Sequence, residues 1–158
     1  MKALSPLQLQ QHFFTHVSVH ANVKGTPKGN LNLEPTFLMQ KNAENERQWV
    51  LVLRVILKSN DPEAPFLYEA DIGIQGLVEI HESFPAERRE QVAAVNGLSL
   101  LYSAIREIVL NVTARSPNGP VCLPTLNFAE VVAEQEAQQK LSNRGSDSGQ
   151  TSVASSQK

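Results

Sequence analysis

The sequence predicts an α+β fold, because its two halves show different hydrophobic periods. In the first half, apolar residues alternate with polar ones, which is the two-residue period of a half-buried strand. In the second half, apolar residues recur every three or four positions, which is the period of a helix. A run of strands followed by a run of helices favours the α+β class over a regular alternation of the two.

Two strands are expected in the N-terminal third of the chain. From Phe13 to Ala21 apolar residues alternate with histidines and a serine, and Phe14 is the one exception. The turn-rich residues 24–30 follow, and a weaker strand is expected from Leu31 to Gln40. Pro35 has no backbone N–H group, so this second strand should lie at an edge of the sheet or contain a bulge.

The next two predicted strands are more apolar. Residues 48–58 are apolar on both faces apart from Arg54, which is typical of a central strand that is covered twice. A turn then leads to a strand over residues 66–80, again with alternating apolar residues. Gly73 and Gly76 predict a bulge within this last strand.

The second half predicts two main helices. Pro85 can open a helix, and the apolar residues between Leu98 and Val112 form one stripe along about five helical turns. Residues 116–120 carry the prolines and the glycine that end it. Asn127 can cap a second helix, with Glu130 reaching back to it in a capping box.

The stripe on the long helix is more apolar than a lone surface helix needs. Its side chains pack either into the core of the chain itself or against another copy of the chain, and the pattern alone leaves both alternatives open. We take the stripe as the candidate oligomer interface, formed by Leu98, Leu101, Tyr102, Ile105 and Val109.

Composition narrows the classes of function. The chain has 158 residues, enough for one domain with its own core, and its formal net charge of −2 gives no basic footprint for nucleic acid. No continuous apolar run is long enough for a membrane span or a secretion signal. A single cysteine excludes an intrachain disulfide. We therefore expect a cytoplasmic protein without membrane insertion or a nucleic-acid partner.

The sequence shows no pattern for catalysis, a cofactor or a metal. His12, His16 and His20 are spaced so that neighbouring members lie about 13 Å apart on a strand, too far to share one zinc ion. Phosphate-binding glycine loops and the nucleophile motif GxSxG are absent. Cys122 is expected to be a buried, inert thiol. We predict neither enzyme activity nor a bound cofactor.

The C-terminal end of the chain differs in composition from the rest. Residues 142–158 contain six serines and almost nothing to bury, so burial cannot offset the entropy lost on ordering them. The sequence therefore predicts a folded domain over residues 1–141 and a disordered tail over residues 142–158.

The region from Leu101 to Phe128 resembles the carboxy-terminal signature of SecB chaperones. That signature is a long helix with an Arg-Glu pair, a serine- or threonine-rich helix end, and a loop that closes on Asn-Phe. The pair is Arg106-Glu107 here, and the loop closes on Asn127-Phe128. Three earlier stretches agree in order with the first, third and fourth strands of that family: residues 7–19, 49–57 and 65–80.

This resemblance implies a four-stranded antiparallel sheet packed with C-terminal helices and assembled as a dimer of dimers, a homotetramer. It also implies an ATP-independent chaperone that holds unfolded or aggregation-prone polypeptide clients in apolar grooves, with several weak sites acting together. The groove residues that it implies are Leu31, Leu33, Phe37 and Met39 in the second strand, and Leu123, Leu126, Phe128 and Val131 in the final loop and helix.

Family members that serve protein transport use acidic residues on the exposed sheet face to dock the translocation motor SecA. Leu67 and Glu69 match that docking pattern, whereas His16 and His20 stand where two acidic residues are expected. The lost carboxylates weaken charge complementarity to SecA, so the partner-docking face formed by these four residues departs from the export type. A related branch holds an aggregation-prone antitoxin in toxin–antitoxin modules, and the sequence leans towards that branch.

Two alternatives to an antitoxin chaperone stay open. The chain could be a general export chaperone that delivers preproteins to SecA, or a scaffold without chaperone activity that binds one folded partner through the same surface. Binding of many unfolded chains, rather than of one folded surface, separates a chaperone from a scaffold.

Overall fold

The computed structural model describes residues 4–146 of the chain. It divides the chain into two compact units, Met1–Phe128 and Ala129–Lys158. The first unit contains the sheet and the long helix. The second unit contains all but the first residue of the C-terminal helix.

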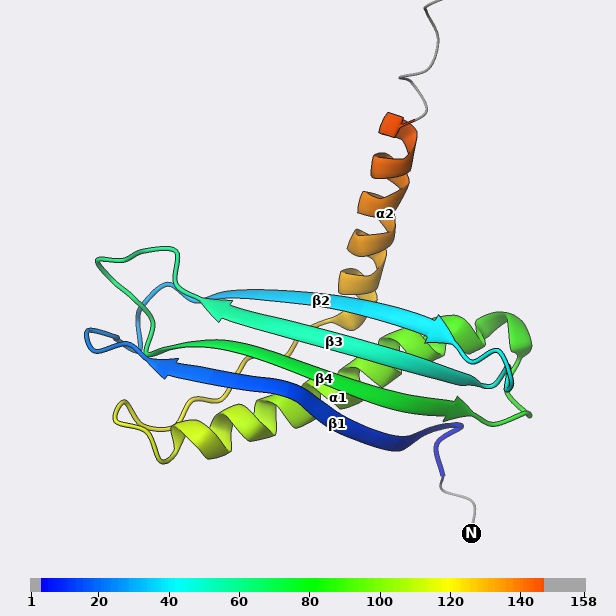
Figure 1. The fold of residues 1–158 in the computed structure, drawn as a ribbon, viewed down its shortest axis with the longest axis horizontal. Helices are drawn as coiled ribbons and strands as arrows, with labels where there is room; N and C mark the ends of the chain where they lie inside the picture. The colour runs from blue at the N-terminus through cyan, green and yellow to red at the C-terminus, as the bar shows by residue number, and fades with distance from the viewer. Residues whose placement is uncertain (1–3, 147–158) are drawn as a thin grey trace, which may run out of the picture. The chain divides into compact units, whose positions relative to one another are not determined.

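The first unit is built on one antiparallel sheet of four strands, as the sequence predicts (Figure 1). The strand order across the sheet is β1-β4-β3-β2. The strands are β1 (Leu7–Ala21), β2 (Asn32–Lys41), β3 (Gln48–Lys58) and β4 (Tyr68–Ile80). The edge position expected from Pro35 is confirmed, because β2 ends the sheet on one side and pairs with β3 without a register shift.

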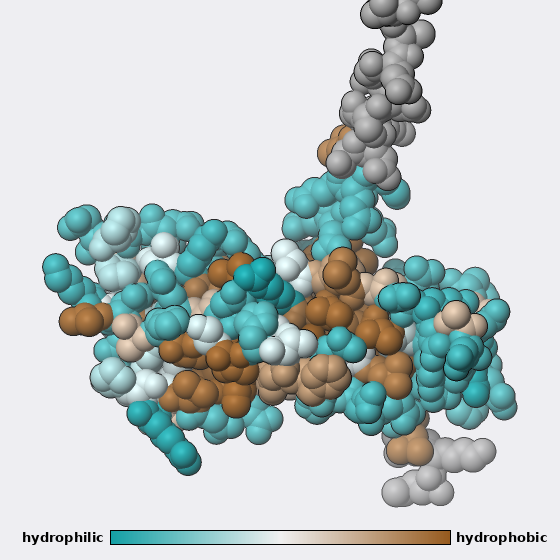
Figure 2. Space-filling model, in the orientation of Figure 1, coloured by the Kyte–Doolittle hydropathy of each residue, from teal (hydrophilic) through white to brown (hydrophobic). Residues whose placement is uncertain are grey.

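The two faces of the sheet differ in burial. On one face, alternate residues of β3 and β4 are buried and form the core together with helix α1 (Arg89–Thr113). On the other face, which we call the open face, Arg54 is exposed and Val50, Val52 and Ile56 are half-buried. The expectation that β3 is covered on both faces is therefore wrong for this unit. Figure 2 shows the open face, with apolar side chains gathered over its middle.

The predicted bulge lies in a different strand from the one expected. Register shifts occur in β1, between Leu9 and Gln11 and between Phe14 and His16, rather than at Gly73 and Gly76 of β4. A Cβ atom at Gly73 would clash with Thr15 and His16, so this glycine makes room for the neighbouring bulged strand. The second shift also explains the irregular pattern, because Phe13 is 51% exposed whereas Phe14 is half-buried.

Helix α1 follows a short 3-10 turn, η1 (Ala86–Arg88), and packs on one face of the sheet against β1, β3 and β4. Gly97 lets it approach closely, because a Cβ atom there would clash with Leu51 of β3. Taken alone, Ala86–Thr113 is long and apolar enough to cross a membrane. Its apolar stripe lies against the sheet, however, as in the core helix of a soluble protein.

The candidate oligomer interface on α1 belongs instead to this core. The side chains proposed for it are all at most 3% exposed within one chain: Leu98, Leu101, Tyr102, Ile105 and Val109. Of the two readings that the pattern left open, the structure selects the intramolecular one. The apolar side chains that α1 leaves exposed are Leu100 and Leu110, at 42% and 40%.

After α1 the chain turns at Gly119, whose φ of 78° is the left-handed conformation that glycine adopts without strain. Residues 120–127, which we call the return segment, have no regular secondary structure. Helix α2 (Phe128–Ser146) begins directly after Asn127, the predicted capping residue. The first five residues of the predicted tail, 142–146, lie in α2, and residues 147–158 lie outside the described part of the chain.

Replacement of Ile105 by glutamate tests whether the α1 stripe is core. Ile105 is fully buried in one chain, so a charge there should cost on the order of several kcal/mol and abolish cooperative thermal unfolding followed by circular dichroism. Gln91→Glu, at an exposed position in the first turn of the same helix, should leave the melting temperature nearly unchanged. An Ile105→Glu chain that keeps its melting temperature but sediments as a smaller species would restore the interface assignment.

Candidate functional site

The predicted site residues of the second strand form one row on β2. Leu33, Phe37 and Met39 pair with residues of β3 whose side chains are buried on the helix side of the sheet: Leu57, Leu53 and Leu51. Because paired residues share a face, the row lies on the helix side. Leu31 directly precedes β2. All four residues are half-buried, although their β3 neighbours are at most 2% exposed.

The incomplete burial of this row follows from where α1 lies. The helix packs against β1, β3 and β4, and its contact with β2 is at most marginal. Apolar side chains on β2 therefore lie beside the footprint of the helix rather than under it. An apolar row that is only half-buried by its own chain offers area that a bound polypeptide could remove from water.

The predicted residues of the final loop do not all reach such a surface. Leu126 is half-buried, but Leu123 and Phe128 are each only 2% exposed. The Phe128 ring meets the ring of Tyr102 edge-on, with centroids 5.6 Å apart. Leu123 and Phe128 are therefore core residues, and their assignment to a groove lining is corrected. Val131 is half-buried in α2, which belongs to the second unit.

The predicted docking residues lie around one end of the open face. His20 is the strand partner of Glu69, and His16 is the partner of Gly73. Leu67 directly precedes β4, and its backbone carbonyl accepts hydrogen bonds from the backbone of Asn22 and the side chain of Asn118. The structure thus brings His20 and Glu69 together.

The open face also carries an ionic cluster that sequence reasoning missed. Arg54 of β3 binds Asp71 of β4 with two nitrogens, at 2.9 and 2.6 Å, and Nε2 of His16 lies 2.8 Å from the same carboxylate. The Arg54 guanidinium and His16 hold the pKa of Asp71 well below its usual range. Arg54 was visible as the lone charge of an apolar strand, but its partner becomes evident only from the strand register. Because the cluster is exposed, its contribution to stability is small.

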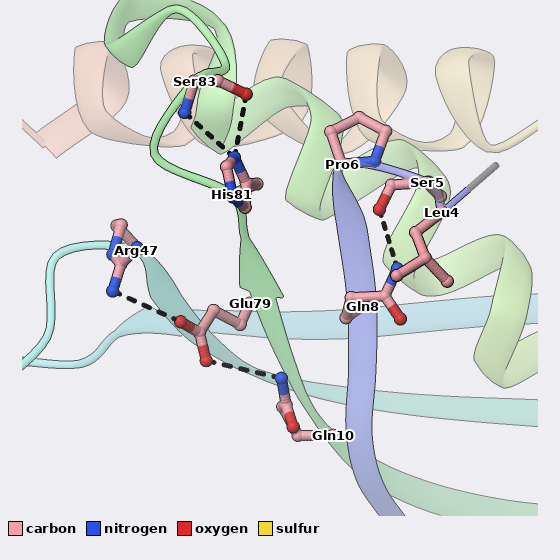
Figure 3. Close-up of a pocket in the computed structure, with 9 residues that line it drawn as sticks. All are labelled: Leu4, Ser5, Pro6, Gln8, Gln10, Arg47, Glu79, His81 and Ser83. Carbon is pink, nitrogen blue, oxygen red and sulfur yellow. Dashed lines mark hydrogen bonds and ion pairs between the residues drawn. The ribbon is translucent and has the colours of Figure 1, made fainter. Parts of the chain in front are cut away.

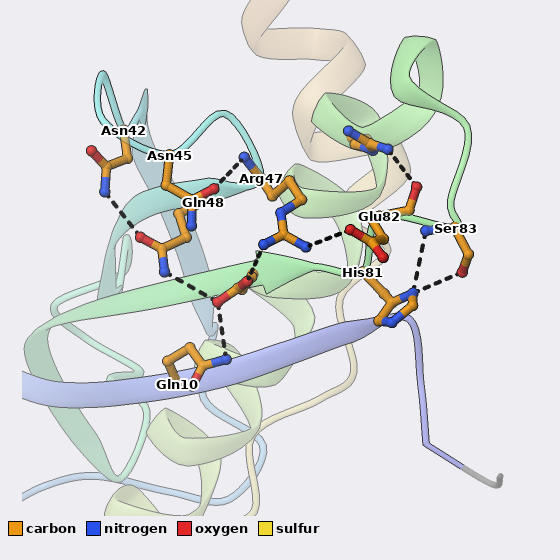
Figure 4. A network of polar contacts seen from close by, with 10 residues as sticks. Gln10, Asn42, Asn45, Arg47, Gln48, His81, Glu82 and Ser83 are labelled. Atoms are coloured by element: carbon orange, nitrogen blue, oxygen red, sulfur yellow. Dashed lines mark hydrogen bonds and ion pairs between the residues drawn. The ribbon is translucent and has the colours of Figure 1, made fainter.

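A pocket of about 770 Å³ lies at the opposite end of the sheet and shares no residue with the predicted sites (Figure 3). It is lined by Leu4, Ser5, Pro6, Gln8, Gln10, Arg47, Glu79, His81 and Ser83. Its polar groups bind one another: Glu79 accepts a hydrogen bond from Gln10 and forms an ion pair with Arg47, which also meets Glu82 (Figure 4). This network satisfies the polar groups locally and joins the ends of β1 and β4 to the β2–β3 turn.

Nothing in residues 4–146 assembles into a metal centre, since no three His, Cys, Asp or Glu side chains come close enough to share an ion. Cys122 is exposed, so the expectation of a buried thiol is wrong. Its Sγ lies 3.5 Å from Nη2 of Arg106.

Two known proteins resemble this chain over most of its length. An uncharacterized protein of Methanocaldococcus jannaschii is 23% identical over 107 residues, which are 68% of this chain and 67% of that protein. The structure of the SecB-like chaperone of Mycobacterium tuberculosis, in complex with a peptide from the HigA1 antitoxin, matches with a TM-score of 0.55 and 21% identity. This match covers 76% of the present chain and 87% of the chaperone, and at such identity it is a likeness of fold.

A protein-family model also matches this chain. The family model described as preprotein translocase subunit SecB matches residues 7–139, which include the sheet, helix α1 and the start of α2. The SecB-like fold expected from the order of strands and helices is therefore confirmed, and this chain belongs to the SecB family.

Proposed function

We propose that the chain is an ATP-independent holding chaperone that binds unfolded or aggregation-prone polypeptide segments on the apolar row of β2, with the half-buried Leu126 of the return segment as a further contact. The observation that carries the proposal is that Leu33, Phe37 and Met39 stay half-buried beside α1, although their strand partners are fully buried. A bound apolar segment would complete their burial. The residues act by contact alone, so binding needs neither a catalytic group nor a cofactor.

The energetics favour weak, repeated contacts. Burying one large apolar side chain contributes about 1.5–3 kcal/mol, and here only the exposed part of each side chain is gained. One row is therefore a weak site, whereas a client that reaches several rows in one assembly gains from effective concentration. A homotetramer, as the SecB family resemblance implies, would supply those rows.

We propose that the outer side of α1 contributes to this assembly. Leu100 and Leu110 project from the helix while its inner stripe is occupied by the sheet, and both are about two-fifths exposed. Large apolar side chains spaced along one exposed helix face are typical of an association surface.

The client is proposed to be an antitoxin, and the protein a cytoplasmic component of a toxin–antitoxin module. Support comes from the fold match to a SecB-like chaperone bound to an antitoxin peptide, and from His16 and His20 on the open face. The alternative is an export chaperone that delivers preproteins to SecA, which would use Leu67 and Glu69. Charge complementarity mainly sets encounter rate and specificity, so the two histidines disfavour SecA without affecting client binding on β2.

A pair of substitutions tests the client surface. Phe37→Ser combined with Leu126→Ser should remove roughly 1–3 kcal/mol of binding per side chain. This should impair suppression of aggregation of an unfolded client more than it lowers the melting temperature. The matched control is Leu38→Ser, which removes a more exposed leucine, at 71%, from the other face of the same strand. This control should suppress aggregation as the wild-type chain does.

Equal loss of suppression in the control and in the double variant would locate the site elsewhere. Binding of one folded protein with no affinity for unfolded chains would favour the scaffold alternative. Added nucleotide should change neither result, because the sequence has no phosphate-binding loop.

The assembly can be tested separately from client binding. The wild-type chain should sediment as a tetramer at micromolar concentration, and Leu100→Ser with Leu110→Ser should yield smaller species with a preserved circular dichroism spectrum. A wild-type chain that sediments only as a 17.4 kDa species would contradict the tetramer.

A further inference from the structure

One side of α1 holds the return segment through side-chain bonds to its backbone. The hydroxyl of Tyr102 donates to the carbonyl of Pro124 at 2.7 Å, and Nε of Arg106 donates to the carbonyl of Leu123 at 2.9 Å. Farther along the helix, Oγ1 of Thr113 accepts a hydrogen bond from the backbone N–H of Val121 at 2.9 Å.

These bonds form an ordered series. Positions 102, 106 and 113 ascend along the helix while their partners 124, 123 and 121 descend, so the return segment runs antiparallel to α1. Figure 1 shows this segment passing back along the helix side of the sheet before α2 begins. The segment lies in neither a strand nor a helix, so its backbone groups lack the regular hydrogen bonds of those elements. The side chains of α1 supply hydrogen-bond partners to some of these backbone groups instead.

We call the bonds that Tyr102 and Arg106 donate to the return segment the clamp. Burial raises the pKa of Tyr102 to about 12, against the lowering influence of Arg106, so the hydroxyl keeps its proton at any ordinary pH. The guanidinium of Arg106 is a planar fork of several N–H donors, and its Nη2 also lies 3.5 Å from Sγ of Cys122.

The side chains of the segment differ in burial along the stretch that these bonds hold. Val121 and Leu123 are buried, whereas Leu126, two residues beyond the last clamped carbonyl, is half-buried. A segment released from α1 would no longer hold Leu126 in one place, and a client would have to order it on binding. Affinity falls when the binding-competent arrangement is only partly populated.

We infer that Tyr102 and Arg106 are positioning residues for client binding, which act by fixing the return segment so that the half-buried Leu126 is held in one place for contact with the client. The inference rests on the proposed chaperone function. It assigns a role to two side chains that need not touch the client.

The experiment compares Arg106→Gln and Tyr102→Phe with Arg89→Gln. Arg89 makes the same kind of bonds at the other end of α1, from Nε to the carbonyl of Phe84 at 2.9 Å and from Nη2 to that of Glu82 at 2.7 Å. Tyr102→Phe keeps the ring that packs on Phe128 and removes the hydroxyl alone. The probe is fluorescently labelled, carboxymethylated α-lactalbumin, which stays unfolded, and its binding is followed by anisotropy.

Arg106→Gln should weaken probe binding about tenfold and Tyr102→Phe about threefold, because a hydrogen bond from a charged donor is worth more than one from a neutral donor. Arg89→Gln should bind as the wild-type chain does. Amide hydrogen exchange should accelerate in residues 120–127 of the two clamp variants and stay unchanged in β3 and β4.

A double-mutant cycle separates a positioning role from a general loss of stability. If Arg106 acts through Leu126, Arg106→Gln should cause little further loss of affinity in a Leu126→Ser background. Full additivity of the two substitutions would overturn the inference, as would an equal effect of Arg89→Gln or accelerated exchange with unchanged affinity. A wild-type chain that binds no probe would overturn the proposed function and this inference with it, whereas the other outcomes leave the proposed function standing.

Discussion

The packing of a single helix on a four-stranded sheet is the constraint on which the other features depend. Four strands spaced about 4.8 Å apart span about 14 Å between the outer axes, whereas a helix with its side chains is about 10–12 Å wide. One helix therefore cannot cover the whole face. Helix α1 covers β1, β4 and β3, and the edge strand β2 keeps an apolar row that its own helix does not bury. The proposed client surface consists of apolar side chains that the core of the chain leaves half-buried.

Much of this arrangement follows from the sequence, but the partners of each apolar stripe do not. Pro35 marks β2 as an edge strand, and the spacing of apolar residues identifies the long helix. Periodicity says which side of a helix is apolar and leaves open what covers it. The apolar stripe from Leu98 to Val109 is therefore compatible with an oligomer interface by its pattern, whereas in the structure the sheet covers it. Gly73 predicts a bulge in its own strand, whereas the residues that need the space beside it, Thr15 and His16, belong to β1, which is distant in sequence.

The candidate site was predictable where it lies on regular structure and less so where it does not. On β2, the family resemblance implies Leu33 and Phe37 as groove residues, and the strand register places both on one face. The return segment has no hydrophobic period, and α1 holds it through side-chain bonds to its backbone. The sequence pattern therefore does not distinguish Leu123, which is core, from Leu126, which is half-buried. The Arg106-Glu107 pair supported the family resemblance, but the acceptor of Arg106 is a backbone carbonyl seventeen residues later, which no side-chain pattern reveals.

The most direct test of the central claim is to locate a bound unfolded chain on one face of β2. Methyl-labelled protein can be titrated with carboxymethylated α-lactalbumin and followed by NMR, because Met39 and Leu38 are neighbours whose side chains point to opposite faces of the sheet. The account predicts that the methyl signals of Leu33, Met39 and Leu126 shift while that of Leu38 does not. Shifts of Leu38 and Val52 on the open face, with Leu33 and Met39 unchanged, would contradict it.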